Sequence, residues 1–195
     1  MNPIEHFLIG WCVASSSTRL TERERLLVTA AAVIPDIDGL GMLVELPTRE
    51  HAHPLLWWTE YHHVIAHNIG AAVVVTIAAA LLSSHRLLTA TLALISFHTH
   101  ILGDLVGARG PDGYQWPIPY LLPFSRTPEL SWNGQWPLNG WQNFVIAGVA
   151  LIITFRLAWK RGYSPLEMLS HRADAAFVAA LRQRFRPRRP AAADA

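Results

Sequence analysis

Histidine and aspartate side chains of the kind that bind metal ions occur in four separate segments of the sequence. Imidazole and carboxylate together suit zinc first, and also manganese or iron. His100 and Asp104 are four residues apart, so both face one side of a helix. The predicted metal ligands are His6, Asp36, Asp38, His62, His67, His100 and Asp104. This set exceeds the four ligands of one tetrahedral ion and predicts a pair of divalent ions, which would clamp an oxyanion and activate a water.

The apolar stretches between these segments could bring the ligands together. At a rise of about 1.5 Å per residue, a helix covers roughly 25 Å over residues 67–84 and roughly 21 Å over residues 86–100. The short polar break at residues 83–86 predicts a turn between two antiparallel helices. A second hairpin of the same kind is expected over residues 6–35, with a charged turn at residues 18–25. The ligands then lie at one end of the bundle and the basic turns at the other.

The composition favours a membrane protein. Apolar residues make up 51% of the 195 residues and charged residues only 15%, whereas soluble domains carry about 25% charged residues. The segment 142–159 is the clearest membrane-spanning candidate, because it is about 18 residues long and has no charge before Arg156. The only cysteine, Cys12, excludes an intrachain disulfide and a cysteine-rich zinc cluster. We therefore predict an all-α fold, a polytopic membrane bundle built from helical hairpins that occupies residues 1–163.

Two further parts of the chain are expected beyond that bundle. Residues 164–186 open on Ser-Pro-Leu-Glu, a helix start, and continue as an amphipathic helix rich in arginine. Such a helix lies on an anionic membrane surface or docks on a partner protein. Residues 187–195 are predicted to be a disordered tail. The long Pro-, Gly- and Trp-rich segment 107–140 is predicted to be irregular and functional.

Charge asymmetry predicts the orientation in the membrane. If both helix turns and the chain after residue 156 share one side, that side holds thirteen of the sixteen basic residues, all except Arg49, Arg109 and Arg126. The positive-inside rule makes it cytoplasmic. Five passes through a bacterial inner membrane would then leave the C-terminus in the cytoplasm and the metal site outside, although the first two apolar segments are short for full spans.

In these residues the sequence resembles the LexA-regulated, membrane-bound metal-dependent hydrolase family of bacterial inner-membrane proteins. The family pattern has a histidine followed four residues later by glycine, a Pro-Asp-x-Asp motif, a His-Arg-Gly-x-Thr-His-Ser block, His-x-x-x-Asp and Pro-Phe-Ser. The matching positions are His6 and Gly10, residues 35–38, residues 62–68, His100 with Asp104, and residues 123–125. In the third block, the arginine, glycine, threonine and serine are replaced by His63, Val64, Ala66 and Asn68.

The resemblance implies hydrolase chemistry, and the sequence suggests which side chains would take part in the reaction. The leading prediction is an enzyme that cleaves a phosphoester or lipid-linked substrate at the extracytoplasmic face, with Asp38, Glu60 or His63 as acid or base. Membrane lipids are expected partners, and nucleic acid is not. The alternative is a membrane protein that binds or transports a divalent metal without catalysis. Transport is the weaker form, because residues 69–82 offer only Thr76 as a polar group.

Overall fold

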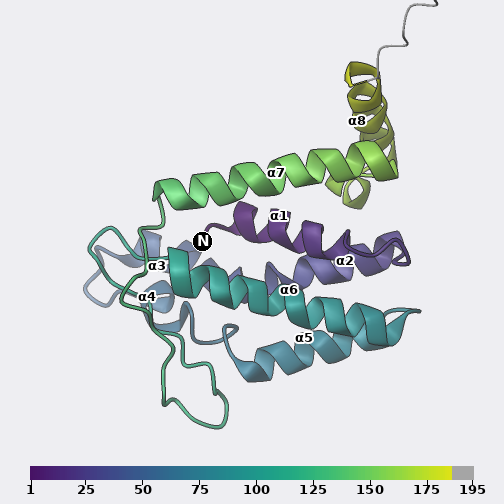
Figure 1. The fold of residues 1–195 in the computed structure, drawn as a ribbon. Helices are drawn as coiled ribbons and strands as arrows, with labels where there is room; N and C mark the ends of the chain where they lie inside the picture. Colours follow the sequence, from purple (N-terminus) through teal and green to yellow (C-terminus); the bar gives the residue numbers. More distant parts are fainter. Residues whose placement is uncertain (186–195) are drawn as a thin grey trace, which may run out of the picture. The chain divides into compact units, whose positions relative to one another are not determined.

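The computed structural model describes residues 1–185 and is all-helical over that range, apart from two isolated β-bridges, which confirms the predicted fold class. The chain divides into two compact units, residues 1–151 and the part that begins at Ile152. Two helical hairpins form the body of the first unit (Figure 1). They consist of α1 (Pro3–Ala14) with α2 (Glu22–Ala31), and of α5 (Ile69–Leu81) with α6 (Arg86–Gly107).

The turns of the two hairpins are tied together by one buried carboxylate. Glu24, in the first turn of α2, accepts hydrogen bonds from the backbone N–H groups of Ser84 at 2.9 Å and His85 at 2.7 Å. Its other oxygen accepts from the backbone N–H of Thr21 at 2.8 Å. This contact fixes the two hairpins in register, so their opposite ends also meet.

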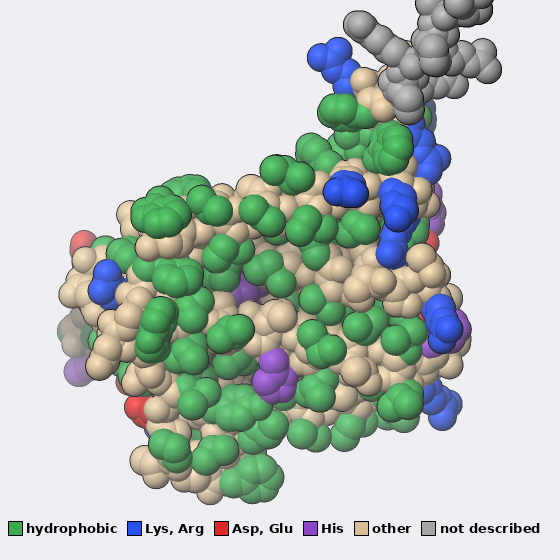
Figure 2. Space-filling view, viewed as in Figure 1, with side chains coloured by type: hydrophobic (Ala, Val, Ile, Leu, Met, Phe, Trp, Pro, Cys, Tyr) green, Lys and Arg blue, Asp and Glu red, His purple; other side chains and the backbone are tan. Residues whose placement is uncertain are grey.

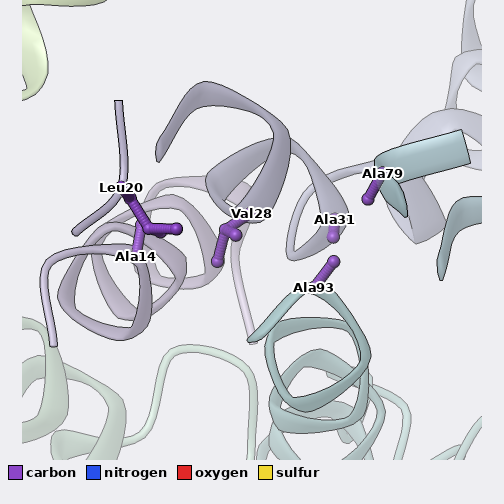
Figure 3. Packing of buried hydrophobic residues seen from close by; sticks show 6 residues of the cluster. All are labelled: Ala14, Leu20, Val28, Ala31, Ala79 and Ala93. Atoms are coloured by element: carbon purple, nitrogen blue, oxygen red, sulfur yellow. The ribbon is translucent and has the colours of Figure 1, made fainter. Parts of the chain in front are cut away.

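Small side chains let the helices approach closely. A buried cluster between the hairpins consists largely of alanine (Figure 3), with Ala14, Leu20, Val28, Ala31, Ala79 and Ala93 as its members. On α1, a Cβ atom at Gly10 would lie 2.6 Å from the Cβ of Ala32. Only glycine fits at this crossing, in keeping with the small residues typical of helix contacts in membranes. The glycine four residues after His6 therefore sets how near α1 comes to α2.

Shorter elements cover the ligand end of the hairpins. The 3₁₀ segment η1 (Ile34–Gly41) follows α2 and leads into α3 (Met42–Thr48), and α4 (Trp57–Tyr61) packs against both. The segment between α6 and α7 (Trp141–Arg161) is irregular, as predicted, and its Ile118 and Leu130 exchange backbone hydrogen bonds. Asn143 anchors this segment, because its side chain donates to Gly107 O and Leu138 O, at 2.8 Å each.

The lengths of the helices support fewer spans than the five passes expected. Among residues 1–185, only α6 and α7 are long and apolar enough to cross a membrane, and α2 with η1–α3 forms a third candidate bent by 51°. α1 and α5, of 12 and 13 residues, are too short for a full span. Figure 2 shows that hydrophobic side chains cover much of this face of the helices.

The second unit contains the end of α7, the 3₁₀ turn η2 (Pro165–Met168) and α8 (His171–Arg184). The predicted single helix from residue 164 is thus interrupted: Ser164 caps only a 3₁₀ turn, and the α-helix begins after Ser170, whose side chain accepts from Ala173 N. α8 carries Arg182 and Arg184 in its last turn. The predicted tail 187–195 lies outside the described residues.

Candidate metal centre

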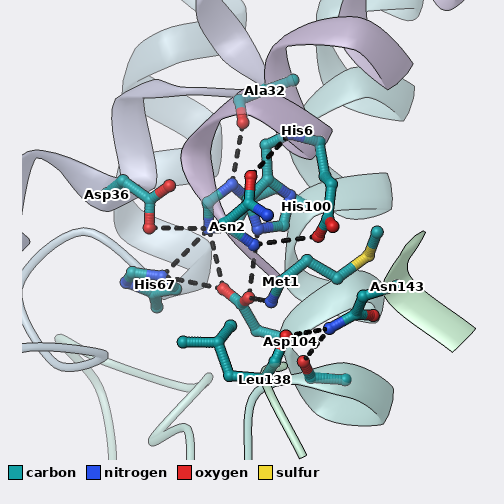
Figure 4. A network of polar contacts seen from close by, with 12 residues as sticks. Met1, Asn2, His6, Ala32, Asp36, His67, His100, Asp104, Leu138 and Asn143 are labelled. Carbon is teal, nitrogen blue, oxygen red and sulfur yellow. Dashed lines mark hydrogen bonds and ion pairs between the residues drawn. The ribbon is translucent and has the colours of Figure 1, made fainter. Parts of the chain in front are cut away.

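Six of the side chains singled out in the sequence converge at the ligand end of the hairpins, within the first unit. Figure 4 shows all of them except His63. The six side chains form two groups whose ligand atoms lie within 4.8 Å of one another, and both groups include Asp104 of α6. The first group is His6, Asp36, His100 and Asp104, and the second is His63, His67 and Asp104. Such groups could hold metal ions, and the shared aspartate is the arrangement expected of a carboxylate that bridges two of them.

The first group joins α1, η1 and α6. Its shortest contact is the 2.9 Å between His100 Nε2 and Asp104 Oδ2. His6 Nε2 lies 3.1 Å from Asp104 Oδ1, and Asp36 Oδ1 lies 3.8 Å from His100 Nε2. The rings of His6 and His100 stack with centroids 3.7 Å apart. Asp104 Oδ1 also accepts a hydrogen bond from the α-amino group of Met1.

The second group comes from the segment before α5. His67 Nε2 lies 3.3 Å from Asp104 Oδ2, and His63 Nε2 lies 3.7 Å from the same oxygen. His67 Nε2 also lies 3.0 Å from His100 Nε2, which links the two groups. The side chains of His63, His67 and Asp104 are almost completely buried, at 4, 0 and 1% exposed. The cluster is therefore shielded from bulk water.

In three histidines, the Nδ1 atom faces away from the cluster and lies beside a group that can only accept a hydrogen bond. His100 Nδ1 donates to the carbonyl of Ala32 at 2.7 Å, and His63 Nδ1 donates to that of Trp116 at 3.3 Å. His67 Nδ1 lies 3.0 Å from Asp38 Oδ2. Partners of this kind fix which ring nitrogen carries the proton, as they do for histidines that bind metals. When these rings are neutral, the Nε2 atom of each carries an unshared electron pair that faces the cluster.

These lone pairs lie close to one another and to a carboxylate. Their surroundings therefore show whether the site fits a cation. The lone pairs of His67 and His100 point at Asp104 Oδ2, a buried oxygen without a hydrogen-bond donor. Asp36 Oδ2 and His6 Nδ1 are also buried without a partner. Acceptors packed this closely repel unless positive charge lies between them. A divalent ion would satisfy the cluster, so the residues fit the metal that the sequence predicts.

A proton is the competitor for that position. Burial lowers the pKa of His67, but the contacts with Asp104 and Asp38 outweigh it and raise this pKa to about 9. Burial dominates at His63, whose pKa falls to about 3 despite the nearby Asp104. His63 thus offers a neutral ring, whereas His67 must lose a proton before it can bind a metal.

Three predicted site residues take other places. Asp38 lies behind the histidines rather than among the converging atoms: its oxygens accept from His62 Nδ1 at 2.8 Å and from His67 Nδ1 at 3.0 Å. His62 belongs to neither group and stacks on Trp58, with ring centroids 3.8 Å apart. Glu60 is exposed on α4. Sequence reasoning missed the carbonyls of Ala32 and Trp116, since no side-chain pattern marks a backbone acceptor.

Comparison with known proteins adds a family to this geometry. A search of curated proteins found no match, and a comparison with solved structures found none either. The family model described as YdjM inner membrane protein matches residues 1–183, which includes both hairpins and every converging residue. The chain therefore belongs to the YdjM inner membrane protein family.

Proposed function

We propose that the protein is a metal-dependent hydrolase that cleaves a phosphoester on the extracytoplasmic side of the inner membrane. The observation that carries the proposal is the convergence of two acceptor groups on the shared Asp104. Two ions held side by side, zinc first among them, supply a stabilising charge for an oxyanion and an activated water when bound. A pair of ions suits a displacement reaction at phosphorus better than it suits simple metal storage.

The chain's own residues would orient the substrate and move protons. The side chain of His62 is mostly buried, with 11% of it exposed, and Asp38 accepts a hydrogen bond from its Nδ1. Its Nε2 is left available for proton transfer, in the manner of other carboxylate–histidine pairs. We assign this role to His62 in place of Glu60, which is exposed, and of Asp38, whose two oxygens are both engaged. His63 is assigned to metal binding.

Metal transport is the weaker alternative. It requires polar groups that continue from the site toward the hairpin turns. The buried cluster between the hairpins is instead apolar, with Val28, Ala31 and Ala93 fully buried within it (Figure 3). Buried hydroxyls of Thr89 and Ser96 also lie along α6, but these neutral groups would compensate a cation only weakly for its lost hydration.

The activity can be tested on purified protein. We expect the zinc- or manganese-loaded protein to hydrolyse a generic phosphodiester such as bis(p-nitrophenyl) phosphate, because the activated water needs no natural leaving group. Chelation should abolish turnover, and added metal should restore it. Two bound ions per chain without hydrolysis of any phosphomonoester or phosphodiester tested would instead support a metal-binding protein that is not an enzyme.

The sidedness can be tested separately in whole cells. A reporter fused after Arg189 should be cytoplasmic, because the basic residues gather at the turns and after residue 156. A cysteine that replaces Asp112, an exposed residue next to Gly113, should react with an impermeant reagent from outside once Cys12 is replaced by alanine. Labelling of this position only after lysis would invert the topology and place the site in the cytoplasm.

A further inference from the structure

A cavity of about 370 Å³ lies beside the metal cluster and is lined by both polar and apolar side chains. Its polar lining includes Asp36, His62 and His63, the residues closest to the proposed reaction. The remaining wall is mainly apolar, with Leu40, Met42, Trp58, Trp116 and Leu138 among its members. The volume falls within the range of about 300–1,000 Å³ typical of small-molecule sites. The cavity thus offers both polar and apolar groups to one ligand.

The apolar wall continues onto the outer surface of η1 and α3. Ile37, Leu40, Leu43 and Leu46 recur at every third position and are 58, 59, 71 and 56% exposed. The polar side of the same segment is turned inward, since the buried Glu45 accepts from the backbone N–H and the hydroxyl of Thr59, both at 2.8 Å. A short helix with its apolar side outward and its carboxylate inward suits contact with lipid rather than water.

We propose that this cavity binds the hydrocarbon chain of a single lipid phosphoester, which enters sideways from the bilayer over Leu40 and Met42. Both residues line the cavity and are also exposed, at 59 and 39%, so they connect it with the apolar surface of η1 and α3. The phosphate then lies beside His62 and His63. The direction follows from the proposed reaction, because Asp36 and His63 belong to the candidate metal groups and Leu40 and Met42 do not.

This inference rests on the proposed function only for the reaction itself, since binding of the lipid's hydrocarbon chain needs no metal. The lipid's chain contributes affinity through burial of apolar area. A phosphoester with the same head group but no chain should bind far more weakly. The substrate class is therefore amphiphilic, and water-soluble phosphodiesters are poor substitutes that reach the histidines without filling the apolar wall.

The test compares lysophosphatidylglycerol, which has one chain, with glycerophosphoglycerol, which has the same head group and none. Retention of each by the full-length, chelator-treated protein in mild detergent is measured by native mass spectrometry. We expect the one-chain lipid to bind at least tenfold more tightly. The double variant L40Q/M42Q, which keeps side-chain size but not apolarity, should lower lipid retention at least tenfold, equivalent to about 1.4 kcal/mol. Leu46→Gln is the matched control, because Leu46 shares the exposed face but does not line the cavity.

The outcomes separate this inference from the proposed activity. Equal binding of the two ligands, or lipid retention in the double variant equal to that of Leu46→Gln, would overturn it. Lipid retention without turnover of the metal-loaded protein would leave chain binding in place and overturn only the hydrolase proposal. Where the protein is active, the double variant should raise KM for the one-chain lipid more than Leu46→Gln does.

Discussion

Asp104→Asn is expected to remove both metal ions at once. Asp104 belongs to both groups of converging atoms and is the carboxylate that lies within reach of His6, His63, His67 and His100. The amide keeps the shape of the side chain but removes the charge that offsets two divalent cations. The loss of affinity should exceed the 10–100-fold typical of changes behind the ligands. Metal content per chain, measured by mass spectrometry of the purified protein, should fall from two to near zero, and phosphodiester hydrolysis should fall with it.

The matched control for this variant is His51→Ala, which changes an exposed histidine at the same end of the chain's first unit. It should keep the full metal complement. Equal yield and equal elution on size exclusion would show that Asp104→Asn still folds. If Asp104→Asn retains two ions and full activity, the cluster is a structural polar network and the hydrolase proposal fails at its centre.

His63→Ala is expected to remove one ion and leave the other. His63 lies only in the second group, whereas the first group of His6, Asp36, His100 and Asp104 stays complete. Metal content should therefore fall from two ions per chain to one. Activity should fall by several orders of magnitude, because an oxyanion clamped on one side loses half of its stabilisation. Metal analysis at equal free zinc and the rate of bis(p-nitrophenyl) phosphate hydrolysis would measure both effects.

The variant His63→Arg tests the departure from the family pattern at this position. A guanidinium cannot bind a metal and stays charged, so it should also reduce the content to one ion. If both His63 variants keep two ions, His63 is a neighbour of the site and not a ligand. In that case, the guanidinium of the arginine variant would be free to bind a substrate oxyanion, and the variant should be at least as active as the parent protein.

The convergence of distant histidines was foreseeable from helix length alone. The rise per residue placed residues 67 and 100 at the same level of a hairpin, and their Nε2 atoms lie 3.0 Å apart. The register between the two hairpins was not foreseeable in this way, because it depends on the carboxylate of Glu24, which reaches from the start of α2 to the turn before α6. Such a contact joins segments that are far apart in the sequence.

The division of roles within the cluster was not foreseeable. His62 and His63 are adjacent, and the chain decides between them by a backbone conformation: His63 has φ +66°, in the left-handed region that non-glycine residues rarely adopt. This conformation turns His63 toward Asp104 and leaves His62 with Asp38. Likewise, the sequence does not reveal that Asp38 accepts hydrogen bonds from two histidines, because this contact depends on how η1 crosses the segment before α5.

The shortness of α5 has a consequence for the surrounding lipid. Its 13 residues cover about 20 Å, whereas the hydrocarbon layer of a bilayer is about 30 Å thick. The exposed Val73, Val74 and Ile77 cannot match lipid tails over that whole thickness. Where α5 faces lipid, we expect the bilayer beside it to become thinner or its lipids to tilt, at a cost of fractions of a kcal/mol per ångström of mismatch. Such thinning would bring the head-group layer closer to the end of the bundle that carries the histidines.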